Sequence, residues 1–168
     1  MLLGSTHTRQ HYDSEEVLIA LLLTQNRYAE AYLLLQKESP NEPSTQYNMA
    51  LCHYYACNYQ QALLNLDKAL SVLPVNKGLT NNHTDQFYKN MRQQQNQQDD
   101  HLHAITRKYI ASFDVLTRDA IVRLKTDCWL HLGEYTKVIE LATPIAHKNY
   151  KNIAEALIIA KNHISNEQ

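Results

Sequence analysis

Glycine and proline are scarce in this sequence. The 168 residues include three glycines and four prolines, whereas strand-rich domains of this size need far more turn residues. The stretches between them are rich in Leu, Ala, Gln, Lys and Glu, which are good helix formers. The sequence therefore predicts an all-α fold, and its length predicts a single domain over residues 1–168.

The chain also lacks a charge excess of either sign and a long apolar run. Sixteen Lys and Arg residues balance seventeen Asp and Glu residues, which argues against the basic surface of a nucleic-acid-binding or polybasic membrane-surface protein. No run approaches the roughly 18 apolar residues of a membrane span, and the first residues lack a secretory-signal pattern. Three cysteines, an odd number, are typical of a reducing compartment. We expect a cytoplasmic protein that binds neither nucleic acid nor membrane.

Sequence motifs that carry chemistry are missing as well. The chain has no Gly-rich phosphate loop, no nucleophile–histidine signature and no paired acidic motif. We therefore expect no enzyme, no catalytic residue and no cofactor. His7 and His11 have the spacing of two metal ligands on a helix, and His101 and His103 would diverge on one. We expect surface histidines at both places and no metal site.

The sequence aligns with itself at an offset of 31 residues. Each unit has an apolar helical run, a short polar break and a second run closed by proline, which is the pattern of a helical repeat. In the second unit, four residues of the second run lie on one face, and we expect them to pack on Met49 and Ala50 of the first run. The residues of that face are Ala62, Leu66, Ala69 and Leu70.

The second unit, residues 43–74, resembles the tetratricopeptide repeat (TPR) family. The family motif has a small residue in the first helix, a tyrosine that opens the second, two alanines and a closing proline. These are Ala50, Tyr59, Ala62, Ala69 and Pro74. Residues 12–43 and about 118–148 match the motif less fully. The resemblance implies a right-handed superhelix of antiparallel helix hairpins, a TPR-like α-α solenoid of about nine helices.

The third unit carries the family's glycine and tyrosine at its break, Gly133 and Tyr135. Pro144 falls inside its second helix and predicts a kink or an end near Thr143. Cys52 and Cys128 occupy the same position of their units, so we expect both to be small packing groups.

Residues 75–116, between the second and third units, carry no family signature. Their apolar spacing predicts two helices, at about 84–98 and 100–112, which form a degenerate hairpin. A last helix, at about 151–164, is expected to cap the stack of repeats.

In the family, the first helix of each unit lines a concave groove that binds partners. The groove positions of the second unit are Tyr47, Leu51, Tyr54 and Tyr55, and tyrosine suits a binding surface because it combines a large apolar area with a polar tip. The tyrosines either face an open groove or are covered by residues 75–116 or the C-terminal helices. The matching positions in the other units are Glu16, Ala20, Leu23, Arg123, Asp127 and Leu130.

The resemblance implies a protein-interaction module, an adaptor or scaffold that binds a peptide or helix of another protein in this groove. Asn48 alone matches the residues with which some family members hold acidic chaperone tails, so we expect no affinity for such tails. The alternative function is a structural subunit whose repeat face is buried in a homo- or hetero-oligomer. It would explain the apolar first helix of the second unit equally well.

Overall fold

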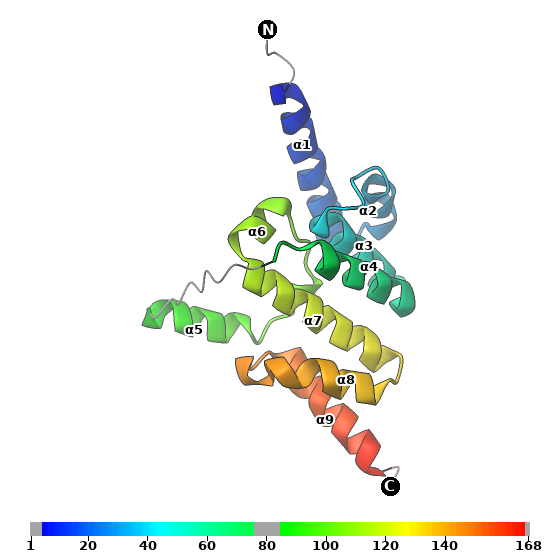
Figure 1. Cartoon of the computed structure of the whole chain (residues 1–168), viewed down its shortest axis with the longest axis vertical. Coiled ribbons are helices and arrows are strands. Elements are labelled where there is room, and N and C mark those ends of the chain that lie inside the picture. The colour runs from blue at the N-terminus through cyan, green and yellow to red at the C-terminus, as the bar shows by residue number, and fades with distance from the viewer. Residues whose placement is uncertain (1–4, 76–84, 167–168) are drawn as a thin grey trace.

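The structure is a computed structural model that describes residues 5–75 and 85–166, with the backbone alone for residues 5–13. Within this part of the chain the fold is all-α, as predicted, and the expected number of about nine helices is confirmed (Figure 1). The α-helices are α1 (Ser5–Thr24), α2 (Tyr28–Leu35), α3 (Pro43–Tyr55), α4 (Tyr59–Val72), α5 (Gln86–Gln95), α6 (Arg107–Ser112), α7 (Asp114–His131), α8 (Tyr135–Ala142) and α9 (Lys151–Asn166). Two short 3-10 helices, η1 (Asp100–Leu102) and η2 (Thr143–Lys148), complete the list. None of the helices described here has the length and apolar character needed to cross a membrane.

Three helix pairs, α1–α2, α3–α4 and α7–α8, are joined by the same turn. The second residue after each first helix is Asn26, Cys57 or Gly133, and these have positive φ angles of 60°, 57° and 74°. In each turn this residue's N–H bonds to the carbonyl three residues back, and the next N–H bonds to the carbonyl five residues back, at 2.8 to 3.1 Å. This pair of bonds is the Schellman motif that ends helices. The three units therefore repeat in backbone conformation as well as in sequence.

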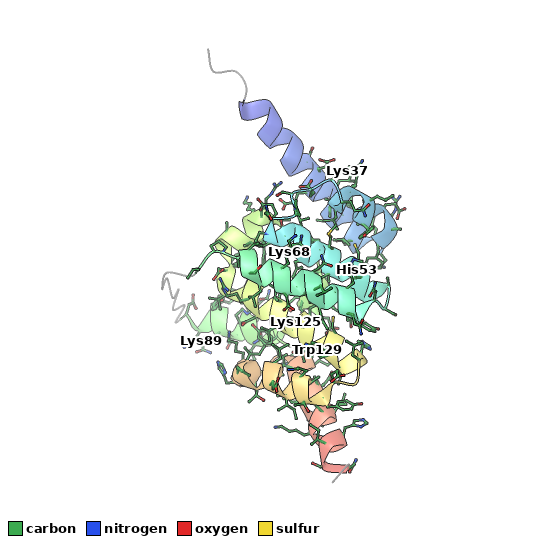
Figure 2. The ribbon with its side chains drawn as sticks, turned by 45° about the vertical axis from the view of Figure 1, so that its right-hand side comes forward. Lys37, His53, Lys68, Lys89, Lys125 and Trp129 are labelled. Atoms are coloured by element: carbon green, nitrogen blue, oxygen red, sulfur yellow. The ribbon has the colours of Figure 1, made fainter. Side chains whose placement is uncertain are left out.

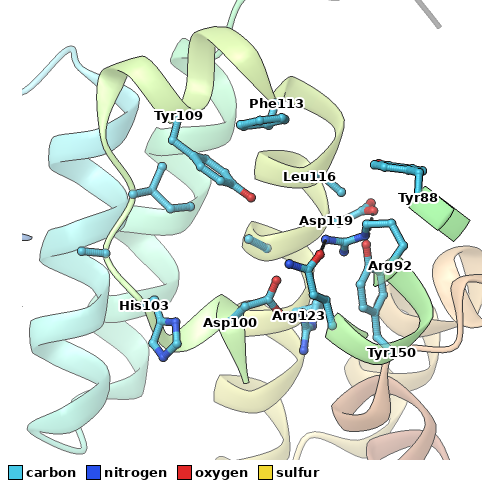
Figure 3. A pocket seen from close by; sticks show the side chains of 14 residues that line it. Tyr88, Arg92, Asp100, His103, Tyr109, Phe113, Leu116, Asp119, Arg123 and Tyr150 are labelled. Atoms are coloured by element: carbon cyan, nitrogen blue, oxygen red, sulfur yellow. Dashed lines mark hydrogen bonds and ion pairs between the residues drawn. The ribbon is translucent and has the colours of Figure 1, made fainter. Parts of the chain in front are cut away.

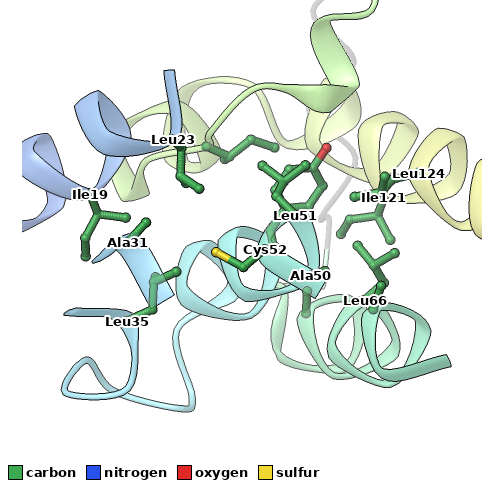
Figure 4. Packing of buried hydrophobic residues seen from close by; sticks show 14 of the residues in the cluster. Ile19, Leu23, Ala31, Leu35, Ala50, Leu51, Cys52, Leu66, Ile121 and Leu124 are labelled. Carbon is green, nitrogen blue, oxygen red and sulfur yellow. The ribbon is translucent and has the colours of Figure 1, made fainter. Parts of the chain in front are cut away.

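The second helix of each unit is buried at equivalent positions. Small side chains there let neighbouring helices approach closely, and α2 packs on α3, α4 on α7, and α8 on α9. Figure 4 shows Ala50 and Cys52 of α3 packed among residues of the neighbouring helices. The fully or almost fully buried equivalents are Ala31, Ala62 and Val138, followed by Leu35, Leu66 and Ala142.

The packing predicted for the second unit is largely confirmed. Ala50, Ala62, Leu66 and Ala69 are buried, whereas Leu70 is 37% exposed. Cys52 and Cys128 are also buried, as expected of packing groups, and burial raises the pKa of both thiols to about 12.

The C-terminal third packs as the sequence predicts. Helix α8 ends at Ala142, and the chain continues through Pro144 as the 3-10 helix η2, which confirms the expected end near Thr143. Helix α9 packs on α7 and α8. Trp129 of α7 contacts the main core and the small cluster between α8 and α9, and Figure 2 shows it on α7 beside α8.

The segment between α4 and α7 differs most from its prediction. The first expected helix is shorter, Gln86–Gln95. The second, expected over 100–112, is wrong in its middle: η1 and α6 are separated by residues 103–106, with extended backbone at His103 and Thr106. Thr106 caps α6 by accepting a hydrogen bond from the Tyr109 N–H at 3.1 Å, and such a cap favours a helix that begins there.

Candidate functional site

Helix α3 binds the main chain of His101 and Ile105, which lie between α5 and α6 in the sequence. The side-chain amide of Asn48 donates to the Ile105 carbonyl at 2.9 Å, and its oxygen accepts from the Ile105 N–H at 3.0 Å. The neighbouring Tyr47 donates its hydroxyl to the carbonyl of His101. All four residues are buried. The first helix of the second unit therefore binds main-chain groups of residues 98–107, which we call the internal segment.

Helix α7 holds the same segment from the other side through Arg123, which is 2% exposed. Its guanidinium donates to the Gln98 carbonyl at 2.7 Å, to the Asn152 side chain at 2.8 Å and to the Asp100 carboxylate. It also lies over the Tyr150 ring, 4.5 Å from the centroid. A buried guanidinium needs such a set of partners because an uncompensated buried charge is costly.

His101 is buried between α3 and α7, so the expectation of a surface histidine there is wrong. It is 1% exposed, and its Nε2 lies 2.6 Å from a carboxylate oxygen of Asp127. The other oxygen of Asp127 accepts from the Asn152 amide at 2.9 Å. The imidazole is drawn inside because η1 brings it to Asp127, while its Nδ1 has no hydrogen-bond partner among the described residues.

The eight predicted partner-binding residues divide into three groups. Four of them contact residues 98–107 of this chain: Tyr47, Arg123, Asp127 and Glu16, whose carboxylate accepts from the Arg107 N–H at 2.7 Å. Leu23 and Leu51 are buried in the core. Six of the eight predicted positions are therefore in contact with other parts of this chain, and Tyr47, Leu51, Leu23 and Arg123 are buried in this conformation.

The third group is Tyr54, which is partly buried against the core, and Tyr55, which is exposed. Tyr55 stacks on Tyr28 with 4.3 Å between ring centroids. Tyr54 packs edge-on against Tyr55, Tyr59 and His131, at 5.4 to 5.7 Å. Burial and the neighbouring Tyr55 raise the pKa of Tyr28 to about 12. These rings link the turns of all three units, which gives them a structural role.

A pocket of about 480 Å³ opens between α5, the internal segment and the corner of α6 and α7 (Figure 3). Helix α5 forms one wall with Tyr88 and Arg92, and the corner between α6 and α7 forms the opposite wall with Tyr109 and Phe113. Residues 100–105 of the internal segment form the third side. The pocket is within the usual size range of ligand sites.

Two carboxylates line the pocket, and both are already paired. Asp100 pairs with Arg123. Asp119 accepts from the Lys148 ammonium at 2.7 and 2.8 Å and from the Tyr150 hydroxyl at 2.7 Å. Burial, followed by the neighbouring Asp119, raises the pKa of Tyr150, so its hydroxyl stays protonated and donates at neutral pH.

Arg92 differs from these groups because its partners are neutral: two side-chain amides and the Tyr150 hydroxyl, whose pKa the guanidinium lowers against the larger effects of burial and Asp119. The guanidinium donates to the Gln95 side chain at 3.0 Å and to the Asn96 side chain at 2.9 Å. Within the described contacts, its positive charge meets no carboxylate at bonding distance.

Helix α5 has no buried residue. Phe87 is 71% exposed, and Tyr88 and Met91 are about 40% exposed. Its C-terminal end is anchored by Asn96, which donates to the Lys148 carbonyl at 2.7 Å and accepts from the Lys151 N–H at 2.9 Å. The rest of α5 stands at the edge of the molecule (Figure 1). The helical spacing of Phe87, Tyr88 and Met91 in the sequence indicates that α5 has an apolar face. It does not indicate that this helix stands opposite Tyr109 and Phe113.

Comparison with known protein families, with curated proteins and with solved structures finds no match for this chain. Among the side chains described, no cluster of His, Cys, Asp and Glu could hold a metal ion. The side chains of His7 and His11 lie outside the described part.

Proposed function

We propose that the chain is a protein-interaction scaffold of tetratricopeptide type, built as a right-handed superhelix of helix hairpins. The motif positions in residues 43–74 support this, as do the identical turns at Asn26, Cys57 and Gly133. The serial packing of α2 on α3 and α4 on α7 is the neighbour-to-neighbour contact expected of such a stack. The role involves no catalysis and no cofactor. We place it in the cytoplasm because the three cysteines are free.

The partner site in this proposal is the pocket beside α5, since six of the eight predicted groove positions are buried or bound to residues 98–107. The observation that carries it is α5 itself, a helix with three exposed large apolar residues beside a pocket whose far wall is also aromatic. Contiguous apolar surface of this kind is typical of interaction sites. A peptide or short helix of another protein would place its apolar side chains between the two walls.

Site-specific photocrosslinking in native lysate tests this assignment. A benzophenone amino acid at position 88 should form adducts with a partner protein that mass spectrometry identifies. The matched control is position 64, since Leu64 is also apolar and is 62% exposed, but lies on α4 away from the pocket. Adducts that form equally at both positions, or at position 64 alone, would contradict the proposal.

A second candidate function is a subunit whose repeat face is buried in a homo- or hetero-oligomer. The observation in its favour is α1, on which Val17, Leu18 and Leu21 are 65%, 44% and 50% exposed. Analytical ultracentrifugation of the full chain checks the homo-oligomeric form. A monomer at micromolar concentration would exclude an obligate homo-oligomer, and Leu21→Ser should dissociate an oligomer built on this face.

A further inference from the structure

The pocket beside α5 has a charge that its own walls do not neutralise. Asp100 and Asp119 are paired with Arg123 and Lys148, whereas Arg92 bonds to neutral side chains. A cation in a half-enclosed site attracts an anion more strongly than an exposed cation does, because the surroundings screen it less. The pocket therefore favours a ligand that carries a negative charge.

A second donor reaches the same space. The hydroxyl of Tyr109 points into the pocket (Figure 3) and has no hydrogen-bond partner among the described residues. Burial raises the pKa of this hydroxyl, so it remains protonated at neutral pH. A guanidinium and a phenol hydroxyl together suit a carboxylate, which can accept a hydrogen bond from each.

The remaining walls are apolar and aromatic. Tyr109 and Phe113 lie with their ring centroids 5.0 Å apart on the side opposite Tyr88, and Leu116 and Ala120 of α7 lie between the two walls. A large apolar side chain placed there would exchange water for aromatic contacts. The site therefore combines one uncompensated cation with an apolar slot.

We infer that this pocket recognises a peptide segment in which an acidic side chain stands next to a large aromatic or aliphatic one. The carboxylate binds Arg92 and Tyr109, and the apolar side chain lies between Tyr88 and Phe113. This inference deepens the proposed function and rests on it, because it specifies which segment of a partner protein the pocket takes. A peptide is favoured over a small acid because the apolar surface continues along α5 past the pocket to Phe87 and Met91.

Fluorescence anisotropy with the full chain tests the inference. The probe is fluorescein-labelled Gly-Ser-Glu-Asp-Trp-Phe-Gly-Ser, amidated at its C-terminus so that the peptide contributes only side-chain carboxylates, and the label is the same in every probe. Matched probes replace Glu-Asp with Gln-Asn, or Trp-Phe with Ala-Ala. Charge-assisted hydrogen bonds should make the acidic aromatic probe bind about tenfold more tightly than the amide version, and the Ala-Ala probe should bind weakly. Equal binding of the acidic and amide probes would overturn the inference.

Substitutions locate the effect. Arg92→Gln should remove the preference for the acidic probe, and Arg92→Lys should keep most of it. Lys89→Gln is the matched control, since it removes the same charge from the same helix (Figure 2) at a residue that does not line the pocket. Loss of the preference in Lys89→Gln, or its survival in Arg92→Gln, would contradict the site.

Tyr109→Phe serves as a second variant that keeps the ring and removes only the hydroxyl. It should weaken the acidic probe several-fold and leave the amide probe unchanged, whether or not Arg92→Gln folds. An unchanged affinity for the acidic probe would exclude Tyr109 as a ligand.

The two proposals fail separately. If a native partner crosslinks at position 88 but the acidic probe has no advantage, the interaction site stands and the acidic segment is wrong. If the acidic probe binds through Arg92 but no protein crosslinks at position 88, the pocket chemistry stands and the scaffold function is wrong.

Discussion

The side chain of Asn48 pairs with the main chain of Ile105, donating to its carbonyl at 2.9 Å and accepting from its N–H at 3.0 Å. These residues are 57 positions apart in sequence, and both are buried. The pair fixes the internal segment to α3, which the sequence predicts to line a groove for partners. Stability of the fold should therefore depend on a residue that in an open repeat would face a partner.

Asn48→Ala should destabilise the protein by about 2–3 kcal/mol, because it leaves a buried N–H and a buried carbonyl without partners. Urea unfolding followed by circular dichroism measures the change. Asn162→Ala, at an exposed position of α9, is the control and should change the free energy of unfolding by less than about 0.5 kcal/mol. A small effect of Asn48→Ala would mean that water replaces both bonds, and that the segment is held mainly by its other contacts.

The turn that recurs after α3 and α7 predicts opposite changes in stability for two substitutions, Gly133→Ala and Cys57→Gly. Gly133 has φ of 74°, and a Cβ added there would meet no atom within 4 Å, so Gly133→Ala tests backbone strain alone and should cost about 1–2 kcal/mol. Cys57 has the same left-handed conformation with a side chain, and it is exposed. Cys57→Gly should therefore stabilise the protein by about 1 kcal/mol. Thermal unfolding of both variants measures the pair, and changes of the same sign would contradict the argument.

The sequence predicts those features of the fold that depend on the residues of one helix alone. Ala62 and Leu66 are placed correctly in the core, because helical periodicity and burial are encoded within α4 itself. The end of α8 near Thr143 is likewise predicted, since proline removes a helix donor wherever it stands. The contacts of Tyr47 and Arg123 with residues 98–101 of the same chain do not follow from the sequence.

The parts that tertiary contacts decide do not follow from sequence. In the sequence, His101 follows Asp100 and other polar residues, which is typical of an exposed position. Its burial follows from its contact with Asp127 of α7, which is 26 residues away. The extended backbone around Ile105 runs through a segment with helical spacing, and tertiary contacts override that preference. Arg92 and Lys89 are two cations of the same polar stretch, and the position of Arg92 opposite Tyr109 depends on how α5 is anchored through Asn96.

The three thiols should differ in reactivity and in their effect on alkaline stability. Cys57 is exposed, whereas Cys52 and Cys128 are buried, so Ellman's reagent at about pH 8 should modify Cys57 first. Burial raises the pKa of the Cys128 thiol from 9.0 to about 12. The unfolded chain therefore loses this proton at lower pH than the folded chain. The contribution of Cys128 to stability is complete below pH 9.0 and is lost as the pH rises toward about 12.

Unfolding measured across this window should show the difference. The free energy of unfolding should fall with pH by at most about 1.4 kcal/mol per pH unit from Cys128, and Cys128→Ala should make the decline shallower. Cys57→Ala is the control, because it removes an exposed thiol instead of a buried one, and it should leave the slope unchanged. Parallel slopes for both variants and the parent would contradict the role of burial.

The ion pair between Arg123 and Asp100 should behave as a coupled unit, because the Arg123 side chain is 2% exposed and the Asp100 side chain is 36% exposed. Asp100→Asn leaves the buried guanidinium with neutral hydrogen-bond partners only, namely the Gln98 carbonyl, the Asn152 side chain and the new amide oxygen, and should cost about 3 kcal/mol because the compensating charge is lost. Arg123→Met removes the buried charge but leaves those partners unpaired. The double variant should be more stable than the sum of the single changes implies, by about 1–3 kcal/mol.

A second double-mutant cycle gives the scale for this coupling. Lys137 and Glu140 are separated by 3.2 Å, but their side chains are 54% and 60% exposed, so their coupling should be below about 0.5 kcal/mol. Urea unfolding of all variants in one buffer yields both values. If the Arg123–Asp100 coupling were as small as that of Lys137–Glu140, then the guanidinium would be held by its neutral partners alone. Asp100 would then be free to exchange Arg123 for solvent, and the internal segment would depend on Asn48 and Tyr47 for its attachment.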